Sequence, residues 1–414
     1  MSFELPYGPV NDGAPRQVAY LTNLYPSPSH SFIRREILGL EAAGWRVHRF
    51  AHRRSHVALV DPADAAELDR TSVLLDQPIR ILALAVLVWL VERPIDAAAA
   101  FLLAMRMAWR GDRRYAAHAA YFVMACALSR RLRDLGCRHL HAHFGTNPAA
   151  VACLAGRVCG LSYSITFHGP HEFDANLRLN LRDKIVAAAF VITVSRGGHR
   201  RVMEQFPELA SRFRLVKCGL DSAWFDAPLS KAQRSVEMLC VARLDPQKDP
   251  MLLLEAVQIL AERGVVFHLN IAGDGMLRAK MEERIAASRL GTHVTLLGWQ
   301  AQWQIIDCLG TARALVLSSH DEGLPVAIME AFALGVPAIA PDVGGVSELV
   351  ETGTTGWLVT RGDATALAEA MHECLRTSPA ELRRMGAEGR RRVLAHDNHV
   401  SVGVLSREFL DVVR

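Results

Sequence analysis

The sequence predicts an α/β protein with two doubly wound parallel-sheet domains that face each other across a cleft. A chain of 414 residues is too long for one ordinary core and suits two domains. Short apolar segments of strand length alternate with segments of helical period, and this alternation restarts after residue 226. We expect domains at 1–225 and 226–396, followed by a helix at 397–414 that packs back on the first domain.

The first domain opens with a strand at Gln17–Thr22, a helix from Ser31 to Ala43 that ends at Gly44, and a strand at Trp45–Phe50. This order of strand, helix and strand favours a parallel sheet of Rossmann type. Further strands are predicted at His139–Ala142, Tyr163–Thr166, Val191–Val194 and Arg214–Lys217.

The second domain repeats this rhythm as a second Rossmann-like sheet. Strands are predicted at Glu237–Val241, Phe267–Ile271, Val294–Leu297, Ala314–Leu317, Ala338–Ala340 and Gly356–Val359. Helices are predicted at Pro250–Arg263, Met276–Ser288, Gln302–Leu309, Val326–Leu334 and Ala364–Thr377. Ligands of open α/β sheets bind beyond the carboxyl ends of the strands, so we expect the site in the cleft between the domains.

The segment from Glu322 to Glu330 indicates function most directly. It reads as a loop, a Gly-Leu-Pro turn and the start of a helix at Val326. A helix amino terminus offers backbone N–H groups to phosphate or sugar oxygens. The two carboxylates are expected roughly 10 Å apart along the helix axis, a span that suits a nucleotide-sugar. The alternative is that both glutamates are solvated surface residues.

Further candidates follow other strands of the second domain. Arg243 and Lys248 follow one strand, where two cations can neutralise a diphosphate leaving group, or else form an exposed loop pair. Gly273-Asp-Gly275 ends the next strand and is either a plain turn or a close approach to ligand. Trp299 is a weaker candidate for a contact with the base of a nucleotide. The glycine pair at 344–345 allows close backbone approach to a ligand or simply a tight turn.

The first domain carries a second group of candidates, which are mostly histidines. His139, His141 and His143 alternate along a strand and so share one face, where a metal site is conceivable but has no Cys or carboxylate partner nearby in sequence. His168 follows a buried strand in a His-Gly turn, which places it at the cleft, although a structural histidine is the alternative. Ser195 lacks the surroundings of a hydrolase nucleophile and is interpreted as a helix cap.

Several function classes are disfavoured by what the sequence lacks. No Gly-x-Gly-x-x-Gly follows the first strand and no Walker-type phosphate loop occurs, which argues against nicotinamide, flavin and P-loop enzymes. No Asp-x-Asp pair occurs, so a metal-clamping sugar transferase is not indicated and we expect no cofactor or metal. No Lys/Arg run interleaved with aromatic residues points to nucleic acid.

Charge and hydropathy point instead to a membrane surface. Residues 1–225 carry 28 Lys and Arg against 19 Asp and Glu, whereas residues 226–414 carry 19 against 24. Within 80–114, two apolar segments are bordered by arginines and are too short to span a bilayer. Either these are ordinary core-facing helices, or they attach the protein peripherally to anionic lipid.

The eight cysteines form no Cys-x-x-Cys pair and read as free thiols of a reducing compartment. The amino terminus shows no basic segment followed by an apolar core, so no secretory signal is predicted. We therefore expect a cytoplasmic protein, peripheral at the inner face of the cytoplasmic membrane.

Taken together, these residues resemble the retaining nucleotide-sugar glycosyltransferases of family 4, which have the GT-B fold. The resemblance rests on Glu322 through Glu330, on Arg243 with Lys248, on Gly273-Asp-Gly275 and on Pro341-Asp-Val-Gly-Gly345. The first half is similar to the transferases of colanic-acid and related exopolysaccharide synthesis in the segments Pro26–Ile33, His141–Phe144 and His168–Asp174. His30 and Ser31 stand where that group has Glu and Thr.

The resemblance implies transfer of a sugar with retention of configuration and without a metal, from a nucleotide-diphosphate sugar to a lipid-linked oligosaccharide. Glu322 would contact sugar hydroxyls, Glu330 would bind ribose, Arg243 and Lys248 would stabilise the departing diphosphate, and His168 would lie beside the reacting sugar. The remaining donor-side candidates are Gly273, Gly275, Trp299, Gly323, Leu324, Pro325 and Val326. The acceptor-side candidates are Ser29, His30, Ser31, His143, His171 and Glu172.

Two alternatives to a glycosyltransferase stay open at this point. One is a non-hydrolysing nucleotide-sugar 2-epimerase on the same fold, which would need no acceptor. The other is a catalytically silent scaffold of the same fold that binds membrane or partner enzymes. The four charged residues of the second domain argue against the scaffold.

Overall fold

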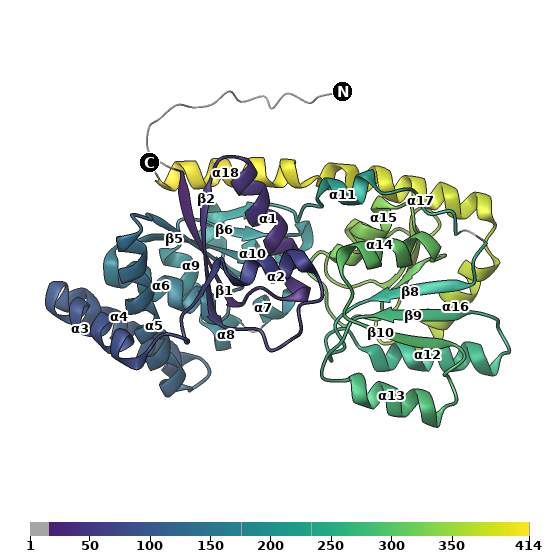
Figure 1. Cartoon of the computed structure of the whole chain (residues 1–414), viewed down its shortest axis with the longest axis horizontal. Helices are drawn as coiled ribbons and strands as arrows, with labels where there is room; N and C mark the ends of the chain where they lie inside the picture. Colours follow the sequence, from purple (N-terminus) through teal and green to yellow (C-terminus); the bar gives the residue numbers. More distant parts are fainter. Residues whose placement is uncertain (1–15, 175, 233, 414) are drawn as a thin grey trace.

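A computed structural model describes residues 16–174, 176–232 and 234–413. It contains two parallel sheets, each flanked by helices, which lie side by side along the long axis of the molecule (Figure 1). The expected α/β class with two doubly wound, Rossmann-like domains is thereby confirmed.

The first sheet has seven parallel strands in the order β3-β2-β1-β4-β5-β6-β7. Its strands are β1 (Gln17–Leu24), β2 (Arg46–Arg53), β3 (Thr71–Val73), β4 (His139–His143), β5 (Ser162–Phe167), β6 (Val191–Thr193) and β7 (Phe213–Leu215). The helices of this domain are α1 (Ser31–Ala42), α2 (Pro62–Leu68), α3 (Ile79–Glu92), α4 (Pro94–Arg110), α5 (Tyr115–Asp134), α6 (Asn147–Cys159), α7 (Pro170–Asp174), α8 (Asn176–Leu179), α9 (Leu181–Ala187) and α10 (Arg196–Gln205).

The second sheet has six parallel strands in the order β10-β9-β8-β11-β12-β13. These are β8 (Glu237–Val241), β9 (His268–Ala272), β10 (Val294–Gly298), β11 (Leu315–Val316), β12 (Ala338–Pro341) and β13 (Gly356–Val359). The helices are α11 (Ser222–Asp226), α12 (Pro250–Glu262), α13 (Arg278–Ala287), α14 (Gln302–Thr311), α15 (Val326–Ala333), α16 (Ala364–Arg376), α17 (Pro379–Val393) and α18 (Asn398–Val413).

Local sequence signals explain where the helices around the cleft begin. Asp249 caps α12 by accepting the N–H of Leu252 at 3.2 Å. Ser195 accepts the N–H of Gly198 at 3.1 Å at the start of α10, so its interpretation as a cap is confirmed. Pro325 precedes the first residue of α15, where a fixed φ favours helix initiation.

The carboxyl-terminal helix crosses from the second domain to the first (Figure 1). In α18, Ser406 accepts a hydrogen bond from the indole of Trp45 at 2.8 Å, and Phe409 is buried in the cluster that contains Tyr20 and Ile33. At its start, Asn398 donates to the carbonyl of Arg35 at 2.9 Å. The return of the chain thus ties α1 to the segment that follows the second sheet.

Helices α3 and α4 lie at the end of the first domain that points away from the second domain (Figure 1). In the described part of the chain, no helix is both long enough and apolar enough to cross a membrane. Both helices bury one face, through Ala85 and Trp89 in α3 and through Ala97 and Ala104 in α4. One face of each helix therefore packs on the core, as the first of the two interpretations of the sequence predicts.

Candidate active site

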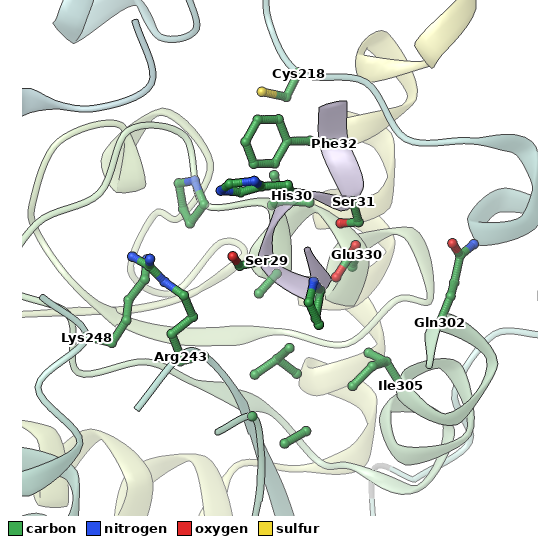
Figure 2. Close-up of a pocket in the computed structure, with 18 of the residues that line it drawn as sticks. Ser29, His30, Ser31, Phe32, Cys218, Arg243, Lys248, Gln302, Ile305 and Glu330 are labelled. Atoms are coloured by element: carbon green, nitrogen blue, oxygen red, sulfur yellow. The ribbon is translucent and has the colours of Figure 1, made fainter. Parts of the chain in front are cut away.

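A pocket lies between the domains, where the loops after the strands of both sheets meet (Figure 2). The first domain lines it with residues from the β1–α1 loop, from α1, and from the segments that follow β4 and β5. The second domain lines it with the loops after β8, β9, β10 and β11 and with the first turns of α15. The site therefore forms only where both domains are in place, as the Rossmann-type topology predicts.

Most of the candidates from the sequence meet in this pocket. From the second domain these are Arg243, Lys248, Gly273, Trp299, Glu322, Gly323, Leu324, Pro325, Val326 and Glu330. From the first domain they are Ser29, His30, Ser31 and His168. Gly275, His143 and Glu172 do not line the pocket, and the side chain of His171 lies outside the described part of the structure.

Glu322 is paired within the second domain. Its Oε1 atom lies 2.7 Å from Nζ of Lys248 and accepts a hydrogen bond from Oγ of Ser319, also at 2.7 Å. Glu322 is 5% exposed, so the ammonium and the hydroxyl replace the water that its carboxylate loses on burial. The pair leaves a fixed carboxylate and a fixed cation next to each other at the pocket.

Arg243 lies beside Lys248 in the pocket, and both cationic ends point into the same region (Figure 2). One guanidinium nitrogen contacts Gln247 at 3.0 Å and Asp245 at 3.1 Å, and the side chain is 41% exposed. Two cations from one loop suit an anion with more than one charge, such as a diphosphate.

Glu330 is buried against a residue of the other domain. Its Oε1 atom accepts a hydrogen bond from Nη2 of Arg35, in α1, at 2.6 Å. Burial raises the pKa of Glu330, and the neighbouring Arg35 opposes this rise. The carboxylate expected to bind ribose is thus neutralised across the domain interface.

His168 is the pocket end of a buried polar chain. Its Nε2 atom lies 2.9 Å from Nδ1 of His143, whose Nε2 lies 3.4 Å from Oε1 of Glu36. The hydroxyl of Tyr20 donates to the same Glu36 oxygen at 2.6 Å. The ring of His168 packs against Phe32, with centroids 4.8 Å apart. These contacts hold the imidazole in one orientation at the cleft.

Two acceptor-side predictions are wrong. His143 has a fully buried side chain, so it reaches the pocket only through His168. Glu172 is also fully buried, and its carboxylate accepts the N–H groups of Gly145, His168 and Gly169. Glu172 therefore shapes the loops after β4 and β5 and cannot contact an acceptor.

The histidine strand also receives a structural explanation. Both ring nitrogens of His141 are hydrogen-bonded, one to Ser164 at 2.7 Å and the other to Thr166 at 2.9 Å. Glu36, His141 and His143 form the one group of potential metal ligands found among the described residues, but His141 has no nitrogen left for an ion. The cluster does not fit a metal.

Glycines allow the loops around the pocket to touch. A Cβ atom on Gly323 would lie 1.6 Å from the carbonyl oxygen of His168, so this glycine permits contact between the domains. Gly344, with φ of +53°, would place a Cβ 1.7 Å from the carbonyl oxygen of Glu322. The pair at 344–345 thus packs on the loop that carries Glu322 and is more than a simple turn.

Sequence reasoning missed several charged residues that line the pocket, namely Arg34, Arg35, Asp61 and Asp64. Arg34 is ion-paired to Asp61 at 3.1 Å and to Asp64. The available signal was the pair of arginines near the start of the predicted helix from Ser31 to Ala43. Both arginines are 4% exposed, and a guanidinium that is buried to this extent needs charged or hydrogen-bonding partners.

The two-sheet architecture with this interdomain pocket defines a protein of the GT-B fold. Two solved structures illustrate the likeness: sucrose-phosphate synthase from Thermosynechococcus elongatus, with TM-score 0.73 and 20% identity over 96% of this chain and 99% of that one, and HepE of Anabaena in complex with UDP and glucose, with TM-score 0.70 and 16% identity over the same shares. At these identities the likeness establishes the fold alone.

Residues 224–392 match the family of glycosyl transferases group 1, so the second domain is a glycosyl transferases group 1 domain. An amylovoran biosynthesis glycosyltransferase of Erwinia amylovora is 35% identical over 179 residues, which cover 42% of this chain and 43% of the relative. A putative colanic acid biosynthesis glycosyltransferase of Escherichia coli is 30% identical over 210 residues, covering 49% and 51%. The chain thus spans about half the length of these curated relatives, and the resemblance stated from the sequence is confirmed for that part.

Proposed function

We propose that the protein is a retaining, metal-independent glycosyltransferase that moves a sugar from a nucleotide-diphosphate sugar to a lipid-linked glycan during synthesis of an exopolysaccharide. The observation that carries this proposal is the convergence of Glu322, Lys248, Arg243 and Glu330 on one interdomain pocket. The group 1 match of the second domain and the names of the relatives support the class of reaction.

In this proposal the donor lies along the second domain. Arg243 and Lys248 bind the diphosphate and stabilise the charge that develops on it as the glycosidic bond breaks. Glu322, held by Lys248 and Ser319, accepts hydroxyls of the transferred sugar. Glu330 accepts the ribose hydroxyls. These are the functions expected from the sequence, and the geometry is compatible with each.

His168 faces the same pocket from the first domain, where it can position the reacting sugar. Attack of the acceptor hydroxyl on the face from which the diphosphate leaves retains the configuration, and the departing phosphate takes the hydroxyl proton. This route needs no separate general base. The structure fits it, because the cations that would bind the phosphate lie at the pocket.

Metal independence is supported by the chemistry of the side chains. In the described part of the chain, the group with suitable ligand atoms consists of Glu36, His141 and His143. Both ring nitrogens of His141 are already hydrogen-bonded, and this histidine lies in the core of the first domain. The pocket instead supplies Arg243 and Lys248 as the positive charge that a diphosphate needs.

Contact with an anionic membrane is supported by the outer faces of α3 and α4. Ile95, Leu102 and Trp109 follow one another at intervals of seven residues on α4 and are 80%, 66% and 57% exposed. On α3, Leu87 and Val91 are 57% and 73% exposed. Exposed apolar side chains in such a stripe, bordered by arginines, are typical of helices that lie in a bilayer interface. A lipid-linked acceptor would be met at that surface.

Product analysis tests the reaction. The protein is incubated with UDP-, GDP- and ADP-sugars and a lipid-linked saccharide acceptor, with and without EDTA, and the anomeric configuration of the product is read by NMR. We expect a product only when acceptor is present, with the donor's configuration and undiminished by EDTA. Inversion, loss with EDTA, or conversion of the donor without acceptor would each contradict part of the proposal, the last by indicating an epimerase.

Vesicle flotation tests the membrane contact. Wild type is expected to float with phosphatidylglycerol vesicles and less with phosphatidylcholine vesicles. Leu102→Glu should reduce flotation, whereas Val266→Glu, at a position of the second domain that is 76% exposed, should not. Equal flotation of wild type and Leu102→Glu would exclude this surface.

A further inference from the structure

Arg35 and Glu330 form a buried ion pair between the two domains. Nη2 of Arg35 lies 2.6 Å from Oε1 of Glu330, and the two residues are 4% and 7% exposed. Both line the pocket, one from α1 of the first domain and the other from α15 of the second. The partners are 295 residues apart in sequence, so only the assembled domains bring them together.

Arg35 is held in place by several elements. Its Nε atom lies 3.3 Å from Oδ2 of Asp221, and its guanidinium lies over the ring of Trp224, 5.5 Å from the centroid. Its carbonyl accepts a hydrogen bond from Asn398 at the start of α18. The segment between the domains and the returning helix therefore fix both the backbone and the side chain of Arg35.

This pair determines how Glu330 can act. A carboxylate buried without a partner would lose its charge or turn toward water, and an adjacent guanidinium prevents both. Among the described residues, Arg35 donates its hydrogen bond to Oε1 of Glu330 and thereby restrains the carboxylate. The other oxygen, Oε2, keeps its lone pairs available for a ligand. The Nη1 atom of Arg35 is buried and has no hydrogen-bond partner among the described residues.

We infer that Arg35 is a positioning residue for Glu330, and that recognition of the donor ribose therefore depends on a side chain of the first domain. This inference rests on the proposed function, because it takes Glu330 to be the ribose contact. It adds that the first domain, which carries the acceptor-side candidates, also completes the nucleotide site. The donor would then be held fully only when the domains are closed on each other.

The test compares a nucleoside diphosphate with its 2′,3′-dideoxy analogue. UDP, GDP and ADP are titrated calorimetrically into the full-length protein, and the tightest of them is paired with its dideoxy form. In wild type the ribose hydroxyls should improve affinity by about 10- to 100-fold, the range expected for hydrogen bonds to a charged group. In Arg35→Gln the ratio of the affinities for the nucleoside diphosphate and its dideoxy form should fall to a few-fold or less.

Four further variants separate positioning from simple structural damage. Arg35→Lys keeps the charge and should give an intermediate ratio. Arg49→Gln removes another buried, ion-paired arginine of the first domain, which does not line the pocket, and should keep the wild-type ratio. Glu330→Gln should lose the ratio, and adding Arg35→Gln to it should cause little further loss, since both act on one interaction.

The outcomes distinguish a failure of donor binding from a failure of the role given to Arg35. If wild type binds none of the nucleoside diphosphates, the proposed function fails. If wild type and Glu330→Gln differ as expected but Arg35→Gln and Arg35→Lys keep the full ratio, the inference about Arg35 is overturned while the proposed function stands. Should Arg35→Gln fail to fold, the ratio of Arg35→Lys decides.

Discussion

Nζ of Lys248 lies 2.7 Å from Oε1 of Glu322, and this ion pair joins two residues whose expected functions are different. Lys248 is expected to bind the departing diphosphate, and Glu322 the hydroxyls of the sugar. In the proposed reaction, their contact would place the sugar and the departing phosphate on one connected pair of residues. A change in either residue will therefore disturb the geometry of the other.

Lys248→Ala and Arg243→Ala should each lower turnover by on the order of 10²-fold or more, because each removes a positive charge directed at the developing phosphate charge. Lys248→Ala should also raise the donor Km, since Glu322 loses its partner. Steady-state kinetics with a saturating acceptor measure both effects. Lys280→Ala, at an exposed position of α13, is the control. Unchanged turnover in the pocket variants would remove these residues from the mechanism.

Gly323→Ala should abolish transfer while the second domain stays folded. The added Cβ would lie 1.6 Å from the carbonyl oxygen of His168, so the domains would have to move apart. Misplacement of about 1 Å at a reacting centre costs on the order of 10²-fold in rate. We expect at least that loss of turnover, together with a larger radius of gyration by small-angle scattering.

Gly291→Ala is the matched control for this experiment, because a Cβ there would meet no atom within 4 Å. Wild-type turnover and dimensions in Gly323→Ala would show that the close contact of the domains is not needed for the reaction.

Glu36→Gln should lower turnover by about tenfold with little change in donor affinity. The Glu36 carboxylate lies 3.4 Å from Nε2 of His143 without forming a hydrogen bond, so it acts through its charge, which favours a proton on that nitrogen. In that tautomer Nδ1 of His143 accepts the N–H of His168. The amide removes this preference and lets His168 adopt another tautomer. Tyr20→Phe keeps the carboxylate and should have a smaller effect. Equal turnover of wild type and Glu36→Gln, at every pH from 6 to 9, would show that the buried chain is only structural.

The free energy of unfolding should fall as pH is lowered from about 6.5 toward 4. Burial lowers the pKa of His30 to about 4, and that of His52 and His139 to about 3. In the unfolded chain these histidines take up protons near pH 6.5, whereas in the folded protein they stay neutral until a lower pH. Their contribution to the free energy of unfolding is therefore complete above pH 6.5 and is lost as the pH falls below it. Asp64 acts in the opposite direction, because burial raises its pKa to about 6.

Urea unfolding at several pH values between 8 and 5 measures this slope. His139→Gln should reduce the slope of the unfolding free energy against pH by an amount that corresponds to at most one proton taken up on unfolding. His56→Gln, at an exposed position, is the control. A stability that stays constant or rises from pH 6.5 to 5 would contradict the account.

The strands and most of the pocket could be predicted because their signals are local. Apolar segments such as Glu237–Val241 are strands in sequence and in structure, and the loops that follow parallel strands must meet at one edge. Glu322, Lys248 and His168 follow such strands. Their presence in one pocket therefore follows from topology alone.

The partners of these residues could not be predicted, since they depend on packing between distant segments. Nothing in the sequence around Glu330 indicates that Arg35 neutralises it. The sequence around Glu172 suggests an exposed carboxylate, although backbone N–H groups of the neighbouring loops bind it in the structure. The strand β3 was missed because it has only three residues, and the helix α5 because its apolar residues show mixed periodicity. The helices α2 and α17 were also missed, although α17 is amphipathic and begins with a capping box of Ser378 and Glu381.

Calorimetric titration of UDP-, GDP- and ADP-sugars into wild type and Glu330→Gln decides whether the interdomain pocket binds a nucleotide-sugar through Glu330. At least one donor should bind wild type at a 1:1 ratio, and Glu330→Gln should weaken this binding by about 10- to 100-fold. Absence of binding to wild type, or equal affinity for both proteins, would contradict it.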